Sequence, residues 1–174
     1  FGQTGEDLSI IGFGGILVTN TEQAEANRLA KYAFDQGINY YDVAPAYGNA
    51  EERLGPAIRD FRQDIFLACK TGKRSKAETI DELHRSLQCL ETDYFDLYQL
   101  HAMMSKDDLD QVLAVGGAIE GLIEARQQGL VRYLGFSAHS VEVAVDLMGQ
   151  FDFDSVLFPV NWVSYFEGNF GPQV

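Results

Sequence analysis

The sequence has few cysteines and no long apolar run, and each absence argues against a class of protein. Its two cysteines, Cys69 and Cys89, lack the spacing of metal ligands, so no zinc or iron–sulphur site is predicted. We expect both thiols to be reduced and mostly buried, which fits a cytoplasmic protein. No stretch approaches the roughly 18 consecutive apolar residues that a membrane-spanning helix needs, so no membrane association is predicted.

Basic residues are also scarce. The chain has 13 Lys+Arg against 26 Asp+Glu, a formal net charge of −13. Such a negative field disfavours nucleic acid and anionic lipid as partners. It does nothing to attract a phosphorylated ligand, so a site for one must be built from local groups. The remaining composition, 46% hydrophobic and 22% charged residues, is that of a globular domain.

Six apolar runs alternate with longer amphipathic stretches along the chain. The runs are rich in Ile, Val, Leu, Phe and Tyr, and several lack polar alternation, which is typical of strands covered on both faces. They span residues 10–14, 38–42, 65–71, 94–101, 131–137 and 155–161.

The stretches between the runs carry helix-end signals. Asn20, Ser75 and Ser140 are candidate N-caps, and Gly37 and Gly129 are candidate helix stops. Ser75 is followed three residues later by a glutamate, which is the spacing of a capping box. These signals predict helices over residues 21–36, 76–90, 117–128 and 141–148.

Strands that are separated by helices cannot form hairpins, so this order predicts parallel strands joined by right-handed crossovers. Two α/β architectures compete, an open doubly wound sheet and a (β/α)8 TIM barrel. A dinucleotide-binding sheet would show GxGxxG, but Gly12, Gly14 and Gly15 lack that spacing. Asp42 could be assigned the ribose-binding role of that fold, but the glycine spacing does not support this. The barrel is therefore favoured.

The number of β/α units limits this interpretation. A whole barrel needs eight units and about 250 residues, whereas six units are visible here. Six strands alone would leave the first and last as unpaired apolar edges. We therefore expect residues 1–174 to form a single barrel domain that lacks its C-terminal strands.

Three neighbouring runs each end in an ionisable residue. Asp42 ends the second run, Lys70 the third (LACKTG) and His101 the fourth (LYQLHA). Because the carboxyl ends of parallel strands share one face, these side chains should meet there, with Tyr47 reaching over from the loop after Asp42. Taken one at a time, Asp42 would be interpreted as a turn residue, Lys70 as a surface lysine and His101 as an interior histidine. Tyr47 alone would be an ordinary tyrosine. At consecutive strand ends, a common site is the better interpretation.

The four side chains suit one kind of chemistry. A tyrosine hydroxyl has a pKa of about 10 and can donate a proton. The ammonium of Lys70, kept charged by Asp42, would lower the pKa of Tyr47, and His101 could hydrogen-bond a substrate oxygen. The set fits reversible protonation of a carbonyl oxygen. Since no side chain can supply a hydride, a nicotinamide cofactor is implied.

Five stretches resemble a known family. FGQTGEDLSIIGFGG, GINYYDVAPAYGNAEERLG, LACKTG, DYFDLYQLH and GLVRYLGFSAHS occur in the order and at the strand ends seen in the aldo-keto reductases. The likeness extends from the first residue to the last and is to a bacterial-type branch. It implies a (β/α)8 barrel whose bottom is plugged by an N-terminal hairpin, of which this chain holds a part.

The resemblance also implies the activity and the roles of the site residues. The expected reaction is reduction of a small aldehyde or ketone with NADPH, or alternatively NADH. Tyr47 matches the general acid, Lys70 and Asp42 the pair that tunes it, and His101 the orienting residue. Asp42, Ser137 and Asn161 are the expected cofactor contacts, although Asn161 stands where the family usually has Gln. The alternative is a non-catalytic nucleotide-binding or redox-sensing partial barrel.

Overall fold

The structure, a computed structural model, describes residues 1–167 and residue 174. In this part of the chain, six parallel strands form one sheet in the order of the sequence, each strand paired to the next. This confirms the predicted α/β fold of six β/α units. The strands are β1 (Phe13–Gly14), β2 (Tyr40–Asp42), β3 (Phe66–Thr71), β4 (Phe95–Met103), β5 (Val131–Ala138) and β6 (Ser155–Leu157).

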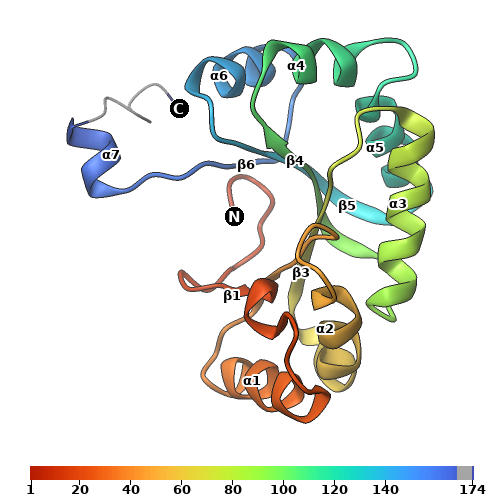
Figure 1. Cartoon of the computed structure of the whole chain (residues 1–174), viewed down its shortest axis with the longest axis vertical. Coiled ribbons are helices and arrows are strands. Elements are labelled where there is room, and N and C mark those ends of the chain that lie inside the picture. Colours follow the sequence, from red (N-terminus) through yellow and green to blue (C-terminus); the bar gives the residue numbers. More distant parts are fainter. Residues whose placement is uncertain (168–173) are drawn as a thin grey trace.

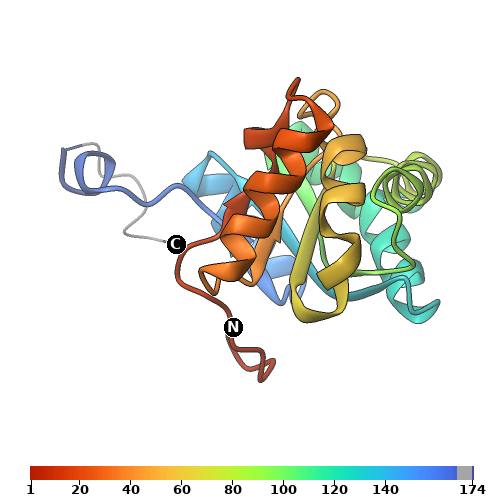
Figure 2. The same cartoon turned by 90° about the horizontal axis from the view of Figure 1, so that it is seen from below.

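Helices cover the outer side of the curved sheet (Figure 1). In that view α1 and α2 lie at the bottom, α3 and α5 on the right, and α4 and α6 at the top, whereas α7 stands apart beyond β6, as it also does in Figure 2. The helical elements are η1 (Gly15–Val18), α1 (Gln23–Asp35), α2 (Ala50–Ile58), η2 (Arg59–Asp64), α3 (Lys76–Cys89), α4 (Lys106–Leu113), α5 (Ala118–Gln127), α6 (Val141–Gln150) and α7 (Trp162–Glu167).

The two edge strands are β1 and β6, and within the described residues each pairs on one side only. Large apolar side chains next to these edges are exposed, among them Ile10 and Ile11 before β1 and Leu157 at the end of β6. The unpaired edges expected from six strands are therefore present.

Alternation along the strands separates two cores, because successive side chains point to opposite faces. The outer core packs the sheet against the helices and includes Tyr41, Leu67, Tyr98, Leu134 and Phe136. A smaller inner core on the other face consists of Phe66, Ala68 and Leu97, and Phe1 and Leu8 pack against it.

The segment before β1, expected to be part of a hairpin, contains no strand within residues 1–12. It begins with a turn in which Thr4 N donates to Phe1 O at 3.1 Å. The Phe1 ring lies 5.4 Å from the ring of Phe66, and Ser9 N donates to Asn39 Oδ1 at 2.7 Å. The segment thus covers the amino-terminal ends of the strands without pairing to them.

Two of the predicted N-caps are confirmed. Ser75 Oγ accepts from Glu78 N at 3.4 Å at the start of α3, and Ser140 Oγ accepts from Val143 N at 3.3 Å at the start of α6. Both bonds satisfy an amide that has no partner inside the helix.

The third predicted cap is wrong, because α1 begins at Gln23 with Glu22 in the N-cap position. Asn20 adopts a left-handed conformation (φ +57°) in the preceding turn, and its amide donates to Asn49 Oδ1 at 2.8 Å. Asparagine tolerates this conformation better than most residues do, so a turn competes with the cap.

Helix α4 was not predicted. Its capping box is complete, because Ser105 Oγ accepts from Asp108 N while the Asp108 carboxylate accepts from Ser105 N. The spacing SxxD at residues 105–108 was the signal that could have revealed it.

Candidate active site

Strand register brings three of the predicted residues to one rim. Lys70 on β3 lies opposite Gln99 on β4, and Asp42 on β2 lies opposite Ala68 on β3. Asp42, Lys70 and His101 share the inward face, because each lies an even number of residues after Tyr40, Ala68 or Leu97, which belong to or pack against the inner core. We call this rim, at the carboxyl ends of β2, β3 and β4, the mouth.

Lys70 is the centre of the mouth. Its side chain is 1% exposed and forms an ion pair with Asp42 Oδ1. The same Nζ lies 3.3 Å from the Tyr47 hydroxyl oxygen and 5.1 Å from the centre of the Tyr47 ring. One buried ammonium therefore contacts both a carboxylate and a phenol, which is the arrangement that stabilises a phenolate.

His101 completes the group from the other side of Tyr47. The two rings lie 5.8 Å apart at an interplanar angle of 87°, an edge-on contact. Burial, followed by the positive charge of Lys70, lowers the pKa of the His101 imidazole. The ring is thus held neutral at neutral pH, with one nitrogen able to donate a hydrogen bond.

Two residues of the mouth were missed by sequence reasoning. Gln99 Nε2 and the Tyr40 hydroxyl each lie 3.3 Å from Asp42 Oδ2, the carboxylate oxygen that does not face Lys70. Burial and the nearby Asp42 charge raise the pKa of Tyr40, so it stays protonated and serves as a donor. The available signal was their spacing, since Gln99 stands two residues before His101 and Tyr40 two before Asp42.

Ser137, an expected cofactor contact, lies on the inward face of β5 and is 5% exposed. Its Oγ accepts a 2.8 Å hydrogen bond from Ala102 N, just after His101. Because the oxygen is used as an acceptor, the hydroxyl proton can be donated to a further group.

Asn161, the other expected contact, lies farther from the strand than expected. β6 ends at Leu157 rather than at 161, and Asn161 is exposed immediately before α7. Its carbonyl oxygen accepts from Tyr165 N at 2.9 Å, so its backbone belongs to the start of that helix.

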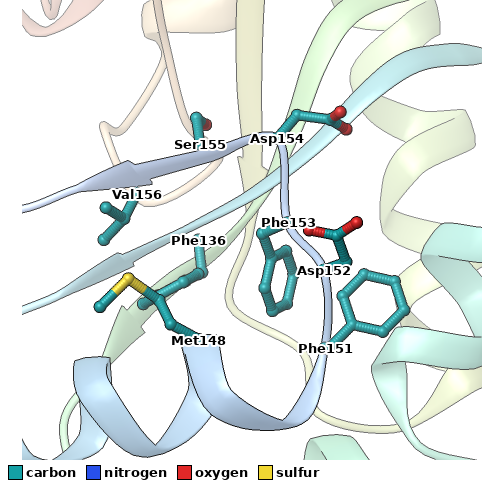
Figure 3. A pocket seen from close by; sticks show the side chains of 8 residues that line it. All are labelled: Phe136, Met148, Phe151, Asp152, Phe153, Asp154, Ser155 and Val156. Carbon is teal, nitrogen blue, oxygen red and sulfur yellow. The ribbon is translucent and has the colours of Figure 1, made fainter. Parts of the chain in front are cut away.

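A cavity of about 310 Å³ lies elsewhere, between α6 and the outer face of β5 and β6 (Figure 3). Phe136, Met148 and Val156 line it. Phe136 is adjacent to Ser137 in β5 and therefore points to the opposite face of the sheet. This cavity is thus separate from the mouth.

The described residues offer no metal centre and no membrane anchor of helical type. No group of three or more His, Cys, Asp or Glu side chains in this part is placed to hold a metal ion. No helix in it is both long and apolar enough to cross a bilayer. Cys69 and Cys89 are free thiols, the first buried and the second partly buried.

A family model described as "Aldo/keto reductase family" matches residues 10–167. The chain belongs to the aldo/keto reductase family.

Individual relatives agree with this. The "Uncharacterized oxidoreductase YqkF" of Bacillus subtilis is 38% identical over 146 residues, covering 76% of this chain and 45% of the relative. The "Aldo-keto reductase YhdN" of the same organism is 32% identical over 158 residues, covering 80% and 46%. The holo form of "aldo-keto reductase AKR11C1" from Bacillus halodurans superposes with a TM-score of 0.80 at 32% identity, covering 91% and 56%. The chain therefore spans about half the length of these curated relatives.

Proposed function

We propose that the protein reduces an aldehyde or ketone to an alcohol with a nicotinamide cofactor, NADPH or NADH. The observation that carries this proposal is the buried Lys70 ammonium, which contacts Asp42 and lies 3.3 Å from the Tyr47 hydroxyl. Family membership supports it. The same proposal includes a small carbonyl substrate and a cytoplasmic location, which the free thiols suit.

Tyr47 is the proposed proton donor. When bound, the cofactor supplies the hydride for the carbonyl carbon, and the carbonyl oxygen takes a proton from the Tyr47 hydroxyl, which yields the alcohol. Lys70 stabilises the resulting phenolate, and Asp42 keeps Lys70 charged. His101, neutral at neutral pH, donates a hydrogen bond to the substrate oxygen and orients it.

Three residues are proposed to hold the cofactor: Ser137, Asn161 and Asp42. The donor chemistry fits a nicotinamide carboxamide, because Ser137 retains a hydroxyl proton after accepting from Ala102 N. Asn161 carries a side-chain amide with both donors and an acceptor. Asp42, whose side chain is 15% exposed, already binds Lys70, so its contribution to cofactor binding is expected to be the smallest.

The domain assignment is part of the proposal. Unpaired edges at β1 and β6, each with exposed apolar neighbours, support residues 1–174 as one side of a single barrel domain. Activity is therefore to be measured on the full-length protein.

The decisive variant is Tyr47→Phe. We expect kcat with NADPH and an aldehyde panel to fall by about 100- to 10,000-fold, the usual contribution of a general acid. Cofactor affinity measured by calorimetry should stay close to the parent value. Tyr32→Phe, an exposed tyrosine on α1, is the matched control. Turnover close to that of the parent in Tyr47→Phe would overturn the assignment of Tyr47 as proton donor. Cofactor binding without turnover in the parent would favour the non-catalytic alternative.

A further inference from the structure

Strand β4 loses its regular pairing immediately after His101. Leu100 pairs with Phe136 and Met103 pairs with Ala138, so β4 uses one residue more than β5 between these pairs. The extra residue forms a β-bulge, in which Ala102 has φ +54°, an unfavourable conformation for alanine. As a result Met103 points into the outer core, and His101 is the last regular inward residue of the strand.

One side chain holds both carbonyls of this bulge. Arg74 Nη2 donates to His101 O at 2.9 Å and to Ala102 O at 3.3 Å. Ser137 Oγ accepts from Ala102 N on the other side. Hydrogen bonds from a guanidinium are stronger than neutral ones, and its planar fork fixes their direction. The strained peptide is thus held from both sides.

Arg74 is itself fixed in place. Its carbonyl oxygen accepts from Ala118 N at 2.8 Å, which ties its backbone to the start of α5. Its Nε donates to Asp108 Oδ1 at 2.8 Å, while Asp108 Oδ2 accepts from Ser105 N at the cap of α4. Burial alone would raise the pKa of the Asp108 carboxyl, but hydrogen bonds from Arg74 and Ser105 outweigh it and lower the pKa to about 2.

We propose that Arg74 is a positioning residue for the reaction, holding the His101–Ala102 bulge so that the imidazole stays against Tyr47. This inference rests on the proposed reductase function. Arg74 acts through the backbone of His101 and through the charge of its own guanidinium. It therefore needs no contact with the Tyr47 side chain or with the substrate.

The charge of Arg74 acts together with several others around His101. Lys70, Arg74 and His139 each disfavour the imidazolium, whereas Asp42 favours it, and the ring of Tyr47 lies against it. Arg74 is the one cation of this set that also bonds the His101 backbone. Removing it should therefore change both the position and the titration of the ring.

The titration of His101 can be measured directly, since imidazole signals can be followed by NMR against pH and the His101 signal assigned from its loss in His101→Gln. In Arg74→Met we expect the His101 pKa to rise and kcat to fall by about 10- to 100-fold, the scale of a small misplacement of a reacting group. Arg74→Lys keeps the charge but not the fork, so the pKa should stay near the parent value while kcat still falls. Arg28→Met removes an arginine charge from exposed α1 and should change neither.

Two outcomes would decide against the proposal. An unchanged His101 titration in Arg74→Met would overturn it, even if the variant were less stable, because a purely structural role predicts that result. A shifted titration with parental kcat would overturn the positioning role. A parent protein without turnover would contradict the proposed function alone, since the titration would still show whether Arg74 sets the environment of His101.

Discussion

Two buried ion pairs lie at opposite ends of the sheet, and they are built differently. At the mouth, Lys70 pairs with Asp42, and the Tyr47 hydroxyl lies within reach of the same ammonium. At the amino-terminal end, which we call the bottom, Arg62 pairs with Asp96 at 3.1 Å, with both side chains less than a tenth exposed.

The bottom pair is saturated with fixed partners. Asp96 Oδ2 also accepts from Leu67 N at 2.9 Å, and its Oδ1 accepts from Arg132 at 2.7 Å. Arg62 donates in addition to three oxygens of neighbouring backbone and side-chain groups, those of Thr92, Ile65 and Tyr94. Both charges are thus compensated by fixed hydrogen-bond partners, so this pair fits a role in stability.

The mouth pair differs in where its ammonium is directed. Lys70 turns one proton towards Tyr47, a group that can itself exchange a proton. In barrels the carboxyl ends of the strands carry the chemistry and the amino ends the stability. The difference between the two pairs teaches that burial alone does not mark a functional charge; a titratable hydroxyl within hydrogen-bond distance of that charge does.

The largest expected effect is on stability at the bottom. Asp96→Asn leaves the buried Arg62 without its counter-charge, and we expect a loss of about 3–5 kcal/mol in the free energy of unfolding. Urea unfolding measures it. Glu25→Gln removes the same charge from an exposed pair and should leave stability nearly unchanged. A loss at Asp96 no larger than at Glu25 would contradict the comparison.

Next in size is the loss of activity at the mouth. Lys70→Met removes the ammonium that stabilises the Tyr47 phenolate, and we expect kcat to fall by about 100- to 1,000-fold. Asp96→Asn, assayed where it remains folded, should keep kcat within a few-fold of the parent. If both variants lost activity equally, the division between mouth and bottom would be wrong.

Much of this fold could be predicted from the sequence, because buried parallel strands are long apolar runs and their order fixes the topology. Each of the six runs overlaps one strand, and register then brings Asp42, Lys70 and His101 to one rim. Each of these residues ends an apolar run, which made it visible against its background.

The missed features share one physical reason: they depend on partners far away in the sequence. Gln99 interrupts an apolar strand, and only the position of Asp42 beside it shows why. The bulge at Ala102 is held by Arg74 and Ser137, from other elements, and leaves no local pattern. Asn20 failed as a cap because a bond to Asn49 decided its conformation.

A smaller effect concerns pH and the ion pair between Arg74 and Asp108 beside the mouth. The pKa of Asp108 in the folded protein, about 2, lies below the ordinary 3.8, so the unfolded chain binds this proton more tightly. The stabilisation, about 2 kcal/mol, is complete above about pH 4 and is lost as the pH falls towards 2. Urea unfolding at pH 6 and pH 3 should therefore show a steeper decline in the parent than in Asp108→Asn. Equal declines would mean that Arg74 does not stabilise the Asp108 carboxylate.

The smallest expected effect tests the far side of the Asp42 carboxylate. Gln99→Met removes one donor to Asp42 Oδ2, which frees the carboxylate to turn away from Lys70, and we expect kcat to fall by about tenfold. Tyr40→Phe removes the other donor at the same oxygen and should lower kcat less by itself, because the Gln99 amide remains.

The double variant of Gln99→Met and Tyr40→Phe should lose more activity than the product of the two single losses, since only then does the Asp42 oxygen lose both side-chain donors. Gln127→Met, on the exposed end of α5, is the matched control. Strictly multiplicative losses would show that the two donors do not act through one carboxylate, and would leave Lys70 as the only side chain that orients Asp42.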